Sequence, residues 1–191
     1  MSKNKLNWIE APMPDSSPGT KLVTFFVNNN EYRSRLMLVE FPPNFKREQE
    51  GYYPAYEELL ILDGGLKISG YEYGKNDYVL FPPNFSRFKT SCPDGCTALV
   101  WWSTKPSWSR GISVNSDNKI ISKLNNNIYD EGYIEFNKNE EFHSLFLDTN
   151  KEKSPIKSEF IGLDLNNFKF VQGYSTDQLP KSRYFLKFTY F

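Results

Sequence analysis

Turn-forming residues interrupt the first half of this 191-residue chain at short, regular intervals. Segments rich in β-branched and aromatic residues, such as Lys21–Val27 and Thr97–Trp102, are bounded by clusters of Gly, Pro, Asn and Asp. Turns at intervals of roughly eight to twelve residues are typical of a β-sandwich or β-barrel. Aromatic residues make up 17% of the chain, so an all-β fold of this kind has enough apolar area for a packed core.

The segment Pro54–Leu62 alternates with a period of two, which predicts a strand with two distinct faces. One face carries Tyr53, Ala55, Glu57, Leu59 and Ile61. The other carries Tyr56, Glu58, Leu60 and Leu62. The next residues, Asp63–Gly65, predict a hairpin turn, because Asp-Gly and Gly-Gly tolerate the positive φ that tight hairpins need.

A seven-residue sequence occurs twice, forty residues apart. Phe41–Arg47 reads Phe-Pro-Pro-Asn-Phe-Lys-Arg and Phe81–Arg87 reads Phe-Pro-Pro-Asn-Phe-Ser-Arg, so six of the seven positions are identical. Two copies are too few for a solenoid, but repetition of this kind reports architecture. We interpret the repeat as one turn used at two equivalent corners of a barrel.

The segment Gly51–Arg87 resembles the two sequence motifs of the cupin superfamily. Glu57, followed by six residues and a glycine, matches the end of the first motif, and Pro82 matches the second. Asn76 and Asn84 stand where the second motif has glycines, and Asn is the best substitute for Gly at positive φ. The resemblance implies an all-β cupin double-stranded β-helix, the RmlC-like jelly-roll barrel, and is nearest to the bacterial cupins related to ChrR-type anti-sigma factors.

The resemblance, which covers roughly residues 8–105, and a change in composition after Trp108 divide the chain into three parts. Residues 1–112 are expected to form the cupin barrel with an extended N-terminal lead-in, and the Ser- and Asn-rich residues 113–127 a linker or loop. Residues 128–191 are expected to supply additional β-strands, which either pack on the barrel or form a degenerate second cupin half. The C-terminal part is slightly short for a full second cupin, which favours additional strands.

The metal-binding histidines of cupins are replaced in this chain. Gly51 and Tyr53 stand at the first two histidine positions, Glu57 at the carboxylate position and Arg87 at the third histidine position. A register one residue longer would place Glu50 and Tyr52 at the first two positions. The first register is preferred because it keeps Tyr53 and Glu57 on one strand face.

These replacements disfavour a metal. Glycine offers no ligating atom, and arginine is a permanent cation without a lone pair to donate. The only histidine, His143, lies outside the motifs, and the pair Cys92 and Cys96 has no further cysteines to complete a zinc site. We therefore expect no metal ligands and no cofactor.

Two interpretations of Arg87 and Glu57 remain open, because both side chains would project into the mouth of the barrel. They form either an ion pair that plugs the former metal site or a site in which Arg87 binds a carboxylate or phosphate. We favour metal-free binding of a small anionic or polar organic ligand by Arg87, Tyr53, Glu57 and Trp101. The alternatives are a metal-independent isomerase or lyase with Tyr53 and Glu57 as catalytic residues, and a structural or regulatory cupin with a plugged barrel.

The charge balance gives no reason to expect nucleic acid or a membrane surface as a partner, since Lys plus Arg and Asp plus Glu number 23 each. Residues Met1–Trp8 contain no apolar core of signal-peptide length, and no run is long enough to span a membrane. We expect a cytoplasmic protein whose partner is a small molecule. The resemblance also implies a homodimer, because cupins commonly pair through sheet edges.

Overall fold

The computed structural model describes residues 5–29, 31, 33–113, 120–123, 130–138, 142–152 and 155–189. The chain divides into two compact units, one of residues 7–126 and one of residues 127–191 with the first six residues. Apart from short 3-10 turns such as Thr176–Gln178 (η3), the regular structure of the described residues consists of strands, which confirms the all-β prediction.

None of the helices in the described part of the chain has the length and apolarity needed to cross a bilayer.

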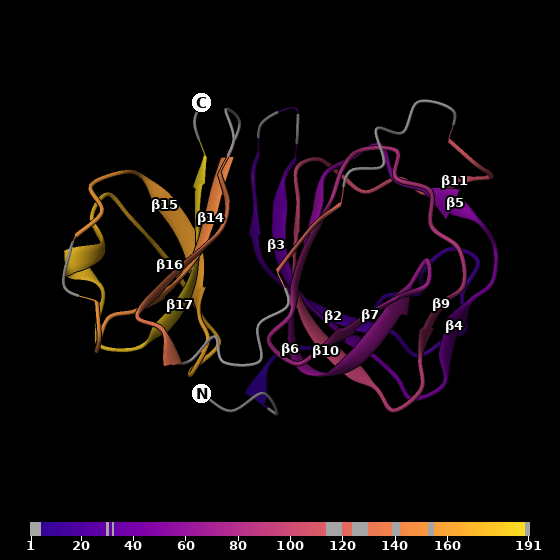
Figure 1. Cartoon of the computed structure of the whole chain (residues 1–191), viewed down its shortest axis with the longest axis horizontal. Coiled ribbons are helices and arrows are strands. Elements are labelled where there is room, and N and C mark those ends of the chain that lie inside the picture. Colours follow the sequence, from indigo (N-terminus) through magenta and orange to yellow (C-terminus); the bar gives the residue numbers. More distant parts are fainter. Residues whose placement is uncertain are drawn as a thin grey trace. The chain divides into compact units, whose positions relative to one another are not determined.

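The first unit is a rolled antiparallel barrel. Its strands are β1 (Ile9–Glu10), β2 (Lys21–Val27), β3 (Arg35–Phe41), β4 (Phe45–Arg47), β5 (Gly51–Tyr52), β6 (Glu57–Ile68), β7 (Tyr71–Gly74), β8 (Tyr78–Phe81), β9 (Thr90–Cys92), β10 (Cys96–Trp102), β11 (Ser109–Arg110) and β12 (Ile121–Lys123). Figure 1 shows these strands curling around a common axis. One of them, β2, has the bounds of the β-branched and aromatic segment noted in the sequence.

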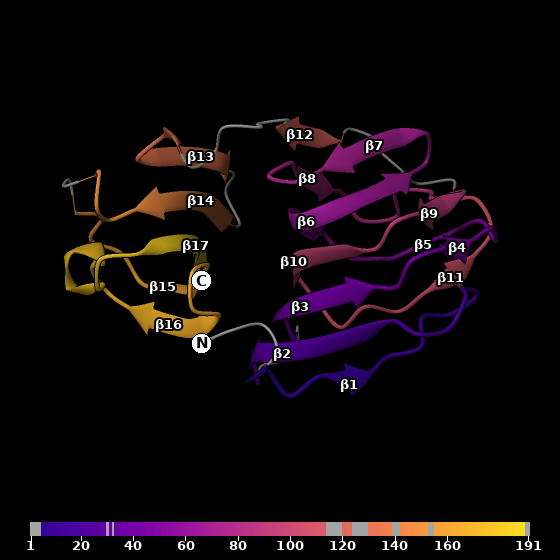
Figure 2. The ribbon, with the colours of Figure 1, turned by 90° about the horizontal axis from the view of Figure 1, so that it is seen from below.

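The strand order shows how the sheet rolls into two layers. Neighbouring strands follow the order β1-β2-β3-β10-β6-β8-β12 (Figure 2). The first half of β6 pairs with β10 and β8, whereas its second half pairs with β7 and β9. Because β9 also pairs with β4, the long strand β6 belongs to both layers of the jelly roll. The short strands β5 and β11 pair with each other.

Side chains of alternate residues fill the space between the layers. One of the two faces predicted for Pro54–Leu62 points inward, because Tyr53, Ala55, Leu59 and Ile61 all lie in the apolar core and Glu57 is buried with them. The other strands contribute Met37, Val39, Phe41, Val79, Phe81, Ala98, Val100 and Trp102. Fully burying a side chain of this size stabilises a fold by about 2 kcal/mol.

The repeated sequence forms the same turn twice, as predicted. Asn44 has φ 62° and Asn84 has φ 64°. In each copy the second Phe donates its backbone N–H to the carbonyl of the first Pro, from Phe45 to Pro42 at 3.2 Å and from Phe85 to Pro82 at 3.3 Å. A proline before a residue with positive φ is the signature of a type II turn. In each copy the second Phe and the final Arg are buried, whereas the residue between them is not.

The prediction of a hairpin turn at Asp63–Gly65 is wrong. Strand β6 runs straight through these residues, and the register against β10 shifts between Thr97 and Ala98. Gly64 has φ 72°, and a Cβ there would collide with the carbonyl oxygen of Gly95. The glycines therefore serve a β-bulge and a close backbone approach rather than a reversal. The reversal lies at Ser69 and Gly70, which both have positive φ as in a two-residue hairpin.

Part of the segment predicted as a linker lies outside the described residues, namely 114–119 and 124–127. Between these two stretches, β12 pairs with β8. This portion of the Ser- and Asn-rich segment therefore adds a strand to the barrel sheet.

The second unit contains one sheet, with the order β13-β14-β17-β15-β16 (Figure 2). The strands are β13 (Tyr133–Lys138), β14 (Phe142–Asp148), β15 (Phe160–Asp164), β16 (Lys169–Gly173) and β17 (Arg183–Thr189). Leu145, Phe160, Leu186 and Phe188 are among its buried core residues. Whether this unit packs on the barrel or represents a degenerate second cupin half stays a prediction.

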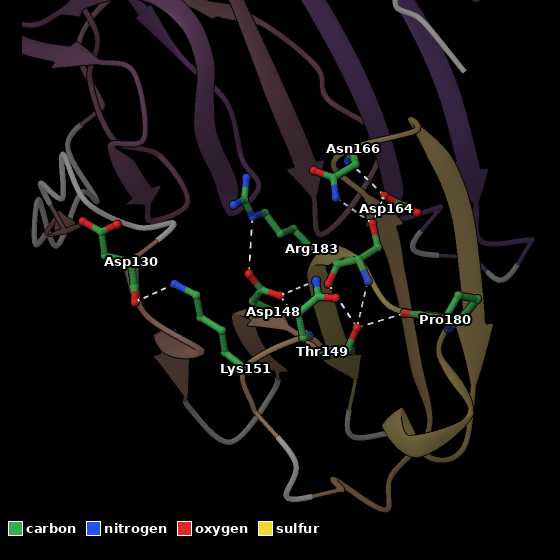
Figure 3. Close-up of polar contacts among 10 residues, drawn as sticks. Asp130, Asp148, Thr149, Lys151, Asp164, Asn166, Pro180 and Arg183 are labelled. Atoms are coloured by element: carbon green, nitrogen blue, oxygen red, sulfur yellow. Dashed lines mark hydrogen bonds and ion pairs between the residues drawn. The ribbon is translucent and has the colours of Figure 1, made fainter.

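Polar side chains hold the strand ends of the second unit (Figure 3). Asp164 Oδ1 accepts hydrogen bonds from the Ser182 hydroxyl at 2.7 Å and from the Asn166 backbone N–H at 2.9 Å. The Thr149 hydroxyl donates to the Pro180 carbonyl at 2.9 Å, and Arg183 contacts Asp148. Since these buried carboxylates already have hydrogen-bond donors, we interpret the network as structural.

Candidate functional site

Three of the four predicted site residues meet inside the barrel. Arg87 Nη1 forms an ion pair with Glu57 Oε2, and the two side chains are only 6% and 8% exposed. The guanidinium carbon of Arg87 lies 5.1 Å from the centroid of the Tyr53 ring. The Arg87 backbone is fixed by Gly51, through hydrogen bonds of 2.8 and 3.1 Å in opposite directions. These contacts place Arg87, Glu57 and Tyr53 in one cluster.

A second buried arginine, Arg47, belongs to the cluster and was not among the predicted site residues. It is 4% exposed, and its Nη2 donates a hydrogen bond of 3.2 Å to the Tyr53 hydroxyl. Its guanidinium carbon lies 4.2 Å from the centroid of the Trp108 ring. The repeated sequence contained the signal, because Arg47 and Arg87 are the last residues of its two copies.

The cluster carries more positive than negative charge. Arg87 faces Glu57, but Arg47 makes no ion pair with any residue that the structure describes. The Nε atoms of both arginines are buried and find no hydrogen-bond acceptor in the described ranges. Buried charges in proteins are normally paired and hydrogen-bonded. The guanidinium groups of Arg47 and Arg87 therefore have one carboxylate, that of Glu57, in their cluster, and the Nε–H donor of each arginine stays unused.

Two adjoining cavities give this cluster space for a ligand. The smaller has a volume of about 30 Å³, and its polar lining consists of Arg47, Arg87, Glu57, Tyr53 and Thr90. The larger has a volume of about 190 Å³ and is lined mainly by apolar side chains. Both cavities share the lining residues Met13, Phe41, Tyr53, Glu57 and Trp102. A cavity of about 10–15 Å³ is enough for one water molecule, so both can hold guest atoms.

The N-terminal lead-in forms one wall of the larger cavity. Residues Ala11–Pro14 line it, and the following Asp15 is fixed to the barrel. Asp15 Oδ2 accepts hydrogen bonds of 2.9 Å from both Trp108 Nε1 and Arg110 Nε. The polar edge of Trp108 is thus occupied, and its ring lies against Arg47 and Tyr53.

Trp101, the fourth predicted site residue, is not brought to these cavities. Neighbouring residues of a strand point to opposite faces, and Trp102 takes the inward position on β10. Trp102 lines both cavities, and its ring lies 4.6 Å from that of Tyr53 in an edge-to-face arrangement. The aromatic wall expected from Trp101 is therefore supplied by its neighbour.

The buried position of Glu57 changes its proton affinity. Burial raises the pKa of Glu57 above its ordinary value of 4.5, although the guanidinium groups of Arg87 and Arg47 act in the opposite direction. The folded protein therefore binds this proton more tightly than the unfolded chain. The contribution of Glu57 to the unfolding free energy must fall as the pH rises from about 4.5 through the raised pKa.

This pH dependence can be measured with Glu57→Gln, which cannot ionise. We expect the difference in unfolding free energy between variant and wild type to move in favour of the variant as the pH rises from about 4.5 to about 7. Urea unfolding of both proteins at several pH values measures that difference. A difference that is constant over this range, or that moves in favour of the wild type, would contradict a raised pKa.

The residues at the cupin metal positions do not fit a metal. A Cβ at Gly51 would collide with the Trp108 ring and with the carbonyl oxygen of Ser109, so no ligating side chain can stand there. Arg87 brings a positive charge to another ligand position, which leaves Glu57 as the one carboxylate of the cluster. The described residues contain no group of three or more His, Cys, Asp and Glu that could hold a metal ion. His143, on β14 of the second unit, lies 3.0 Å from Glu135 instead.

Comparisons with known proteins support the fold. Protein Ylba from E. coli is similar over 100% of this chain and 82% of its own, with a TM-score of 0.59 and 12% identity. A protein from Nostoc punctiforme, provisionally assigned as a dioxygenase, is similar over 97% of this chain and 72% of its own, with a TM-score of 0.57 and 13% identity. A provisionally named glyoxylate-induced protein from Pseudomonas aeruginosa covers 95% of this chain and 84% of its own, with a TM-score of 0.53 and 10% identity.

These neighbours are cupin-fold proteins, so the cupin fold expected from the motifs is confirmed. No family model matches the chain, and no curated protein matches it. At identities of 10–13% the likeness shows the fold alone. The expected kinship with ChrR-type cupins stays a prediction.

Proposed function

We propose that the barrel binds a small organic anion without a metal and holds its acidic group between Arg47 and Arg87. The observation that carries this proposal is the buried guanidinium of Arg47, which forms no ion pair with any carboxylate of the described residues. Burying an unpaired charge costs several kcal/mol, and a bound anion offsets this cost. The plugged-barrel alternative explains the pair of Arg87 and Glu57, but it leaves Arg47 unexplained.

The chemistry of the cluster suits an acidic group. Guanidinium groups present planar pairs of N–H donors that match carboxylate and phosphate oxygens. The unused Nε donors of Arg47 and Arg87 support this role, and the Tyr53 hydroxyl, which already accepts from Arg47, can donate its own proton. Glu57 lowers the net charge of the cluster without neutralising it.

Titration with benzoate and with its neutral analogue benzamide tests the proposal. We expect chelator-treated protein to bind benzoate but not benzamide. Arg47→Met should weaken benzoate binding by about 10- to 150-fold, because it removes a charge-assisted hydrogen bond to the carboxylate. Calorimetry measures both affinities. Lys67→Met is the matched control, because it removes one positive charge from an exposed ion pair with Glu72. The proposal would be overturned if the wild type bound benzamide as tightly as benzoate, or if Arg47→Met bound benzoate as tightly as the wild type does.

The raised pKa of Glu57 also favours a second candidate, a metal-independent enzyme in which Glu57 and Tyr53 exchange protons with the ligand. A carboxyl group with a raised pKa is suited to general acid–base catalysis near neutral pH. Protein-dependent exchange of deuterium from solvent into a bound organic acid, followed by NMR, detects such proton transfer. Exchange that is lost in Glu57→Gln would favour the enzyme, whereas binding without exchange favours the binding protein.

A further inference from the structure

We infer that the ligand is a compact monocarboxylate whose apolar body has about the size of one aromatic ring, with benzoate as a representative of the class. This inference rests on the proposed anion site and goes on to specify the charge, size and polarity of the ligand. Each of these properties follows from a different part of the cluster and its cavities.

Charge balance favours a single acidic group. Arg47 and Arg87 supply two positive charges, and Glu57 supplies one negative charge. The carboxylate of Asp15 also acts on Arg47, but it is already paired with an exposed arginine and adds no net charge. One carboxylate makes the buried cluster neutral, whereas a dianion would leave an excess negative charge beside Glu57 in a poorly solvated space. Another arginine, Arg35, lines the larger cavity, but it is only half-buried and water can solvate it. The structure therefore does not require a second acidic group.

Volume limits the body of the ligand. A cavity of about 150 Å³ lined by apolar side chains holds a benzene molecule in another protein. The larger cavity here has a volume of about 190 Å³, enough for one ring. Because it shares five lining residues with the smaller cavity, a ring in the larger space can carry its carboxylate toward the arginines.

The lining of the larger cavity disfavours a polar body. It includes Leu22, Met37, Val39 and Val100 from three neighbouring strands, together with prolines of the lead-in. Trp108 also lines it, but its indole N–H already donates to Asp15 at 2.9 Å. Hydroxyl groups of a sugar acid would lose water here and gain few partners, which weakens binding. Each buried CH₂ group, in contrast, strengthens binding by about fourfold.

A series of acids tests the inference on the wild-type protein at constant ionic strength. We expect benzoate to bind at least tenfold more tightly than acetate. We also expect 2-naphthoate, which exceeds the cavity, and terephthalate, which adds a second charge, to bind more weakly than benzoate. Gluconate, as a polar acid, should not exceed acetate. Calorimetry or ligand-observed NMR gives the affinities.

One variant separates the two cavities. Leu22→Trp fills part of the larger cavity from a half-buried position, away from the arginines. We expect it to lose at least tenfold in affinity for benzoate while its affinity for acetate stays unchanged. Its circular dichroism spectrum and unfolding midpoint report whether it folds, and the acid series on the wild type stands independently of that result.

The outcomes distinguish failure of the inference from failure of the proposed function. If carboxylates bind through Arg47 but acetate, gluconate or terephthalate binds as tightly as benzoate, the anion site stands and the inferred ligand class is wrong. If no acid in the series binds, or if Arg47→Met binds them all as well as the wild type, the proposed function itself fails.

Discussion

Arg87→Met lowers the unfolding free energy at pH 7 by about 3–5 kcal/mol, the cost of breaking a buried ion pair by removing one partner. The variant leaves Glu57 buried, with its strongest charge partner gone. The loss should shrink as the pH falls, because protonation of Glu57 removes the unpaired charge. Urea unfolding followed by tryptophan fluorescence measures the change.

Two further variants show whether this loss of unfolding free energy comes from the Glu57 carboxylate that is left without its ion-pair partner. Adding Glu57→Gln to Arg87→Met should recover most of the lost unfolding free energy, because both members of the ion pair are then absent and Arg47, which forms no ion pair in the wild type, is the one charge left in the cluster. Lys67→Met, which breaks an exposed pair with Glu72, should cost no more than about 1 kcal/mol. A loss below about 1 kcal/mol for Arg87→Met would show that Glu57 and Arg87 are not coupled in a buried pair.

Arg47→Met has the opposite effect on stability, although it is the same substitution at the equivalent position of the repeat. Arg47 forms no ion pair with a carboxylate in the described part of the chain, so replacing it removes a buried charge that is only partly compensated. The variant loses a hydrogen bond to Tyr53 and a contact with the Trp108 ring, each contributing about 1 kcal/mol. We expect a net gain of about 1–2 kcal/mol in unfolding free energy, within the range observed when buried ions are replaced by apolar groups.

This gain in stability should accompany the loss of anion binding. Residues that bind ligands often reduce the stability of the ligand-free protein. Unfolding of wild type and Arg47→Met, without and with benzoate, measures both effects, because a ligand stabilises only the protein that binds it. If Arg47→Met is destabilised as strongly as Arg87→Met, then Arg47 supports the fold, and its unpaired charge is not a ligand site.

The fold could be predicted from the sequence because its signals are local. Alternation along Pro54–Leu62 separated the residues of its two faces, and the Pro-Pro-Asn turns identified two corners. The Asp63–Gly65 error has a physical cause, since glycine is required both for a reversal and for a bulge against another backbone. The approaching residue, Gly95, is distant in sequence, so the pattern around Asp63 cannot distinguish the two.

The site could be predicted only in part, because its members come from separated segments. The motif positions identified Tyr53, Glu57 and Arg87, which the structure brings together. Trp101 and Trp102 lie on opposite faces of β10, and their sequence alone does not indicate which of the two points inward. Arg47 was missed because the repeat was interpreted as a turn alone. The last residue of each copy, Arg47 or Arg87, follows the same turn and is buried beside the smaller cavity of the barrel.

The most direct test of an anion site between the two arginines is anomalous diffraction from crystals soaked in bromide, a monatomic anion that the smaller cavity can admit. The account predicts an anomalous peak inside the barrel, in contact with the guanidinium groups of both Arg47 and Arg87, and no such peak in Arg47→Met. Bromide peaks confined to exposed arginines and lysines, with none at the buried pair, would contradict it.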